Sequence, residues 1–124
     1  MPELFVLSID QGTTGSRAIL YNRLGRLKSS AYREFKQYYP KPGWVEHDPH
    51  EILQSVKNVI SEVLRKSGVR PNQIQSIGIT NQRETIVLWD RLSGKAVSKS
   101  IVWQDRRTSD LCAKLKKQGL EPKF

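Results

Sequence analysis

The chain has 124 residues, 37% of them hydrophobic, which is enough for one compact domain and too few for two of ordinary size. Its 21 Lys and Arg residues against 12 Asp and Glu residues give a formal net charge of +9, which favours phosphorylated or other anionic partners. The single cysteine, Cys112, excludes an internal disulfide, and residues 1–10 match neither a secretory signal nor a membrane span, so we expect a soluble, cytoplasmic protein.

The first predicted elements are three strands joined by tight turns. Phe5, Leu7 and Ile9 are apolar at every second position, and the run ends at Asp10. It is apolar enough for a strand that is nearly buried on both faces. A turn rich in Gly and Thr separates this strand from a second one at residues 18–21. Turn-forming residues at 22–25 then precede a third strand at 27–35. This order predicts an antiparallel meander.

A helix follows, and its start is the clearest in the chain. Asp48 can cap it, Pro49 suits the first helical position, and Glu51 can complete a capping box. Gly68 and Pro71 are expected to end it. The apolar residues that share one helical face are Ile52, Val56, Val59, Ile60, Val63 and Leu64.

The rest of the chain predicts more strands and a second helix. Strands are expected at residues 74–80 and 85–89, and a further one at 97–103. A second helix is expected at 107–118, with both of its leucines facing inward. A meander, a crossover helix and further strands predict an α/β fold, in which helices flank a mixed sheet.

Two polar segments, residues 10–17 and 81–84, follow predicted strands, where ligands bind in open α/β sheets. In the first segment, Gly12 and Gly15 let the backbone approach a phosphate, hydroxyl and N–H groups can donate to it, and Asp10 can hold Mg²⁺ through water. The segment lacks the GxxxxGK[ST] pattern of a P-loop. The alternative is a plain hairpin turn capped by the aspartate.

The second polar segment suits the hydroxyl groups of a small polyol. Glu84 would accept hydrogen bonds from hydroxyls and Arg83 would donate to other oxygens, whereas the alternative is a surface ion pair. Trp103 could form an apolar wall beside the carbon atoms of such a ligand, although a core tryptophan is the commoner outcome. Trp44 and Trp89 are expected in the core.

Four ordered segments carry a resemblance to a known family. They are DQGTT at 10–14, YPKPGWVEHDP at 39–49, IGITNQRET at 77–85 and VWQDRRT at 102–108. In sequence, order and separation they resemble the glycerol kinase family, which is part of the FGGY carbohydrate kinases in the actin-like ATPase superfamily. The resemblance spans nearly the whole chain.

The resemblance implies ATP-dependent phosphorylation of glycerol to sn-glycerol 3-phosphate with Mg²⁺, on a ribonuclease-H-like mixed sheet. It implies that Arg83 and Glu84 bind the glycerol hydroxyls and that Trp103 lines their pocket. His47 is expected to be structural. The residues that it assigns to ATP and ADP phosphates are Thr13, Thr14, Gly15 and Arg17, with Asp10 serving the metal ion.

The chain departs from the family pattern in two ways. Gly15 stands where many members have Ser, which removes one hydroxyl donor. Members run to several hundred residues, so residues 1–124 are expected to be the N-terminal part of the first FGGY kinase domain and the fold to be incomplete. The general base is then expected beyond Phe124, no catalytic residue lies within the chain, and the chain alone should not turn over substrate.

Three alternatives stay open at this point. A related FGGY carbohydrate kinase could act on another polyol or sugar, and a non-catalytic binding module could retain the same fold. A basic nucleic-acid-binding domain is disfavoured, because the basic residues are scattered through periodic segments. An uncovered sheet face would also favour self-association of the chain.

Overall fold

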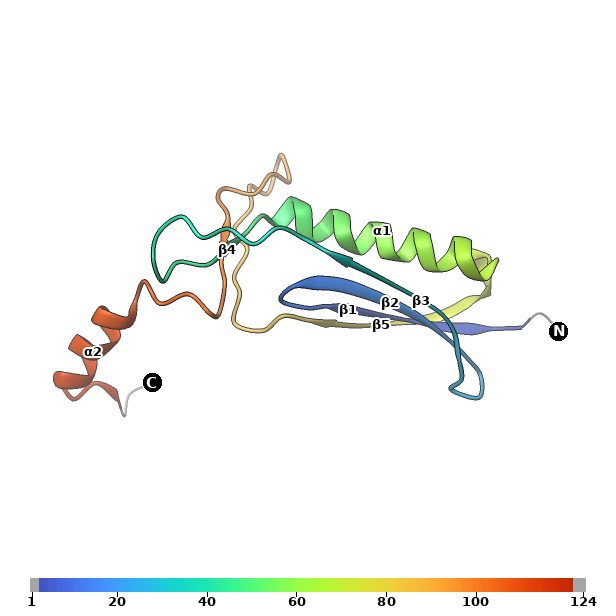
Figure 1. Ribbon diagram of the computed structural model, residues 1–124, viewed down its shortest axis with the longest axis horizontal. Coiled ribbons are helices and arrows are strands. Elements are labelled where there is room, and N and C mark those ends of the chain that lie inside the picture. The colour runs from blue at the N-terminus through green and yellow to red at the C-terminus, as the bar shows by residue number, and fades with distance from the viewer. Residues whose placement is uncertain (1–2, 122–124) are drawn as a thin grey trace.

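Three antiparallel strands begin the fold, as expected, in a computed structural model that describes residues 3–121 (Figure 1). Residues 1–2 and 122–124 of the predicted domain lie outside the described residues. The strands are β1 (Phe5–Gln11), β2 (Gly15–Asn22) and β3 (Leu27–Glu34). With β5 (Ile74–Asn81), which runs parallel to β1, they form a four-stranded sheet in the order β3-β2-β1-β5. The predicted mixed sheet is confirmed.

The crossover between β3 and β5 contains the long helix α1 (Pro49–Ser67). Asp48 caps it as predicted, because its Oδ1 accepts a hydrogen bond from the His50 N–H at 2.8 Å. The predicted capping box is wrong: the Oε1 atom of Glu51 instead accepts a hydrogen bond from the Tyr38 hydroxyl at 2.7 Å. Gly68 ends the helix with a φ of 71°, which glycine adopts without strain. A 3₁₀ helix at Pro71–Gln73 then leads into β5.

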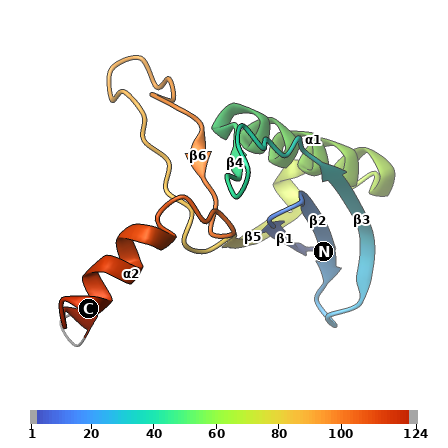
Figure 2. The same cartoon turned by 60° about the vertical axis from the view of Figure 1, so that its left-hand side comes forward.

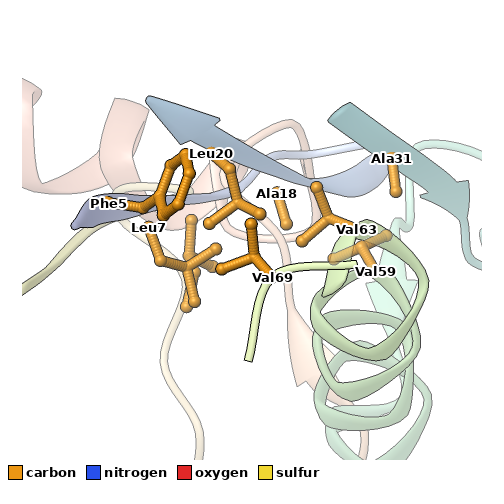
Figure 3. Packing of buried hydrophobic residues seen from close by; sticks show 9 residues of the cluster. Phe5, Leu7, Ala18, Leu20, Ala31, Val59, Val63 and Val69 are labelled. Atoms are coloured by element: carbon orange, nitrogen blue, oxygen red, sulfur yellow. The ribbon is translucent and has the colours of Figure 1, made fainter. Parts of the chain in front are cut away.

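The hydrophobic core lies between α1 and one face of the sheet (Figure 3). Its buried members are Phe5, Leu7, Ile9, Ala18, Leu20, Ala31, Val59, Val63 and Val69. The expectation that β1 is buried on both faces is wrong, because α1 covers only one face and Val6 on the other is 38% exposed. The helix packs mainly against β2 and β3, so Ile77 and Ile79 on β5 remain 57% and 73% exposed.

The region after β5 differs most from the prediction. Residues 85–89 form no strand, and a single bridge joins Trp89 to Ala96 in an open hairpin. Of residues 97–103, only β6 (Ser100–Ile101) is a strand, and it pairs with β4 (Glu46–His47) in a separate sheet. The hairpin lacks an apolar layer to pack on, as the exposure of Ile86 at 73% and of Trp89 at 63% shows.

The second predicted helix exists as α2 (Ser109–Lys117). Its leucines were predicted to face inward, and this is wrong for Leu111, which is 55% exposed. The helix projects away from the sheet in both views (Figures 1 and 2). Within residues 3–121, no helix combines the length and the apolar character that crossing a membrane requires.

Candidate functional site

The turn after β1 and the loop after β5 open into one shared hollow. The two strands are parallel neighbours, with Gln11 opposite Asn81 at their ends, so both connections leave the sheet at the same edge. The hollow has a volume of about 470 Å³. Its lining residues are Gly12, Thr13, Asn81, Gln82, Arg83, Glu84 and Trp103. The structure therefore brings together the two polar segments and the tryptophan that sequence reasoning selected separately.

The turn between β1 and β2 is held by its own backbone and by the segment after β3. The Gly12 N–H donates to the Gly15 carbonyl at 2.9 Å, and a Cβ at Gly12 would lie only 3.1 Å from that oxygen. The Phe35 N–H donates to the Thr14 carbonyl at 3.3 Å, and the Gln37 Nε2 donates to the Thr13 carbonyl at 3.1 Å. These bonds fix the turn without using the hydroxyls of Thr13 and Thr14.

The predicted phosphate contacts Thr14 and Arg17 both lie next to Tyr32 of β3 and do not line the hollow. Arg17 is exposed on β2, opposite Tyr32 of β3, and its guanidinium carbon lies 5.4 Å from the centre of the Tyr32 ring. The Thr14 hydroxyl is 3.2 Å from the Tyr32 hydroxyl. Sequence reasoning missed Tyr32, because nothing local to residue 32 reveals its partner across the sheet.

Asp10 is exposed near the end of β1, between Arg17 and Thr80 on the neighbouring strands. No cluster of three or more His, Cys, Asp or Glu side chains able to hold a metal ion occurs among the described residues. A single exposed carboxylate beside a phosphate turn still fits Mg²⁺, which keeps several waters and takes much of its coordination from substrate phosphates.

Arg83 and Glu84 line the hollow and are both exposed. Within residues 3–121 neither forms an ion pair, which argues against the alternative of a surface salt bridge. Glu84 has a φ of 58°, the left-handed region that costs a residue with a side chain about 1 kcal/mol. The loop therefore holds the backbone of Glu84 in a strained conformation, with its carboxylate at the hollow.

Trp103 closes one side of the hollow. Its indole is 52% exposed, so the alternative of a core tryptophan is wrong. The Nε1–H donates to the Thr13 hydroxyl oxygen at 3.0 Å and joins this wall to the phosphate turn. Trp89 is also exposed rather than in the core, and Trp44 is half-buried beneath the Arg107 guanidinium, whose carbon lies 3.7 Å from its ring centre.

A chain of polar side chains, buried at His47 and Gln82 and half-buried at Gln37, connects the two loops that open into the hollow. Gln37, which donates to the Thr13 carbonyl, is hydrogen-bonded through its Oε1 to the Nε2 of His47. The Nδ1 of His47 lies 3.1 Å from the Nε2 of Gln82, the residue before Arg83. An amide nitrogen only donates, so His47 accepts at Nδ1 and carries its hydrogen on Nε2. Its expected structural role thus includes a link between the loops.

This arrangement predicts a loss of stability in mild acid. Burial lowers the pKa of His47 below its ordinary value of 6.5, and His47 is fully buried. The unfolded chain then binds this proton more readily, so the free energy of unfolding is highest above pH 6.5 and falls below it, by at most about 1.4 kcal/mol per pH unit. Urea unfolding midpoints at pH 7.5, 6.5 and 5.5 measure the effect.

Other groups do not obscure this pH window. The Arg107 guanidinium holds the pKa of Asp105 at about 2, so the stability that this carboxylate contributes is lost only at much lower pH. An NMR titration of the His47 imidazole signals follows this group directly. A midpoint that stays constant from pH 7.5 to 5.5 would contradict the prediction.

An ion-pair cluster holds the segment that carries Trp103. The Arg107 guanidinium donates to Glu46 at 2.9 Å and to Asp105 at 2.8 Å, with all three side chains largely shielded from solvent. Asp105 also accepts a hydrogen bond from the Val45 N–H at 2.6 Å. Together with the pairing of β4 and β6, these contacts fix residues 102–107 against residues 44–47. The cluster therefore positions the tryptophan wall of the hollow.

Comparisons with known proteins show the family to which the chain belongs. The model for the N-terminal domain of the FGGY family of carbohydrate kinases matches residues 5–124. A glycerol kinase from Oceanobacillus iheyensis is 58% identical over 121 residues, which cover 98% of this chain and 24% of the relative. A glycerol kinase from Staphylococcus epidermidis is 55% identical over 122 residues, with coverages of 98% and 24%. The chain thus spans about a quarter of the length of these curated relatives.

Solved structures of similar proteins have the same fold. The Plasmodium falciparum glycerol kinase with ADP superposes with a TM-score of 0.81 at 36% identity, over 91% of this chain and 23% of that chain. A gluconate kinase from Lactobacillus acidophilus superposes with a TM-score of 0.86 at 23% identity, over 98% and 24%, and shows the fold alone. The predicted fold class, incomplete relative to these larger proteins, is confirmed.

Proposed function

The chain belongs to the FGGY family of carbohydrate kinases, and we propose that it is the N-terminal part of a glycerol kinase, which transfers phosphate from ATP to glycerol to form sn-glycerol 3-phosphate. The observation that carries the proposal is the shared hollow, where a phosphate turn faces Arg83, Glu84 and Trp103. The names of relatives at 53% to 58% identity support it. On this proposal, residues 1–124 are the N-terminal part of the first kinase domain.

The nucleotide would lie against the turn between β1 and β2. The backbone of Thr13 to Gly15 and the hydroxyl of Thr13 would donate to phosphate oxygens, the Thr14 side chain would contact the phosphates, and Arg17 would add a positive charge. Asp10 would hold Mg²⁺ through water, and the ion would neutralise charge on the phosphates when bound. The ADP named for the Plasmodium falciparum structure supports a nucleotide here.

Glycerol would occupy the part of the hollow beside the loop after β5. The Glu84 carboxylate would accept hydrogen bonds from glycerol hydroxyls, and Arg83 would donate to their oxygens. The indole of Trp103 would cover the carbon atoms and exclude water from one side. These groups orient the acceptor hydroxyl toward the phosphate turn, which is how positioning lowers the barrier to phosphoryl transfer.

We place no catalytic residue within this chain, and we propose that it is inactive alone. It spans about a quarter of the length of its relatives, so the groups that complete both binding sites and the general base would come from the remainder. A coupled assay of glycerol-dependent ADP release, run on this chain and on a chain extended in frame to the natural stop codon, tests the proposal. Activity of the extended chain alone supports it.

Activity of neither chain would favour a non-catalytic module, and activity with another polyol or sugar in place of glycerol would favour a related kinase. Light scattering on the same two preparations tests the expected self-association through the exposed β5 residues Ile77 and Ile79. The 124-residue chain is expected to associate and the extended chain to do so less. A monomeric short chain at high concentration would contradict that expectation.

A further inference from the structure

A tyrosine stands over the glycine of the phosphate turn. A Cβ added to Gly15 would lie 2.7 Å from both Cζ and the hydroxyl oxygen of Tyr32, and 2.5 Å from the Arg33 carbonyl. Such separations are too short for any side chain, so the tyrosine ring uses the space that a residue 15 side chain would otherwise fill. The hydroxyl of Tyr32 therefore comes directly beside the turn from another strand.

We propose that Tyr32 binds a phosphate oxygen of the nucleotide and supplies the hydroxyl donor that Gly15 lacks. The inference rests on the proposed nucleotide site and adds a residue to it. Its ligand is a nucleoside diphosphate or triphosphate, recognised through the phosphates rather than through the base.

Tyr32 and Thr14 together carry one more hydroxyl hydrogen than their mutual hydrogen bond uses. Their hydroxyl oxygens are 3.2 Å apart, and either can donate to the other. Two hydroxyls carry two hydrogens, and their mutual bond uses one of them, so Tyr32 can donate to a ligand while Thr14 donates to Tyr32. Tyr32 is 42% exposed and Thr14 is also exposed, so the remaining hydrogen can reach a ligand. An anionic oxygen is the acceptor that such a donor binds most strongly.

The positive charge of Arg17 lies beside Tyr32 and would attract a phosphate. Arg17 is its direct partner across β2 and β3, and the guanidinium carbon lies 5.4 Å from the ring centre. Ala18 and Ala31, the next residues along these strands, are buried under α1, so Arg17 and Tyr32 share the opposite face of the sheet. Arg17 and the Tyr32 hydroxyl can therefore contact the same anion at the turn.

The test is Tyr32→Phe in the extended chain, with ADP as the probe. Phenylalanine keeps the ring over Gly15 and beside Arg17 and removes only the hydroxyl. Isothermal titration calorimetry at fixed Mg²⁺ is expected to show ADP binding weakened about tenfold, because a hydrogen bond to a charged group is lost. Binding of adenosine and of glycerol is expected to be unchanged, and the melting temperature to match that of the parent.

Tyr39→Phe is the matched control, since Tyr39 is 68% exposed and its hydroxyl forms no hydrogen bond to the turn among the described residues. It is expected to bind ADP like the parent. If Tyr32→Phe also binds ADP like the parent, the inference is overturned while the proposed function stands. An equal loss of adenosine binding overturns it as well, since the tyrosine would then act on the whole ligand. A parent chain that binds no ADP would overturn both.

Discussion

Replacing Arg83 with alanine in the extended chain is expected to lower kcat/KM for glycerol by about 100-fold, the effect of losing a charged hydrogen-bond donor worth about 3 kcal/mol. Arg83 lines the hollow, is exposed, and forms no ion pair among the described residues, so its guanidinium is available to a ligand. Affinity for ADP is expected to change less than about twofold, because the proposed phosphate site is the turn between β1 and β2, whereas Arg83 lies in the loop after β5.

Arg91→Ala is the control for this variant. Arg91 is an exposed arginine in the hairpin that follows the same strand, and it lies outside the lining of the hollow. The same charge is removed, and activity is expected to stay within about twofold of the parent. If both variants lose activity equally, net charge rather than the placement of Arg83 is responsible, and the proposed glycerol site is wrong.

Replacing His47 with phenylalanine is expected to lower the free energy of unfolding by about 3 kcal/mol. The imidazole is fully buried, and it bonds Gln37 on one side and Gln82 on the other. Phenylalanine fills a similar volume and keeps an aromatic edge against Phe35, whose ring centre lies 5.0 Å away. The expected cost therefore comes mainly from the amide groups that lose their partners, at about 1 to 3 kcal/mol for buried Gln82 and less for half-buried Gln37.

Urea denaturation followed by circular dichroism measures this change. His50→Phe serves as the control, because His50 is exposed at the start of α1 and, among the described residues, its side chain accepts only one hydrogen bond, a long one of 3.4 Å from the Ala96 N–H. That variant is expected to stay within about 0.5 kcal/mol of the parent. Equal unfolding midpoints for His47→Phe and the parent would show that the buried polar chain contributes nothing to stability.

Local signals account for the parts of the fold that were predicted correctly. Alternation at every second residue located β1, and Asp48, Pro49 and Gly68 bounded α1, because caps and periodicity act within a few residues. The strand expected at 85–89 did not form, although its apolar residues favour one. Strand propensity reflects packing against a neighbour, and this segment has a single bridge, from Trp89 to Ala96, and leaves Ile86 73% exposed.

The residues of the site also fall into those that the sequence could predict and those that it could not. Arg83 and Glu84 could be selected because they directly follow a predicted strand, and the structure places them in the hollow. Gln37 and Tyr32 could not be selected, since their partners are set by the register between strands and by the path of the chain after β3. The left-handed backbone of Glu84 likewise has no signal in the sequence, where glycine is the usual residue for that conformation.

The parallel pairing of β1 with β5 also sets the order in which the hollow can form during folding. β1, β2 and β3 are linked by short turns, whereas β5 reaches β1 only after the chain has passed through α1. Closing the longer loop costs more chain entropy, so contacts that are close in sequence are expected to form first. The phosphate turn thus belongs to the early, local part of the fold. The loop carrying Arg83 and Glu84 joins it only with the last and least local pairing.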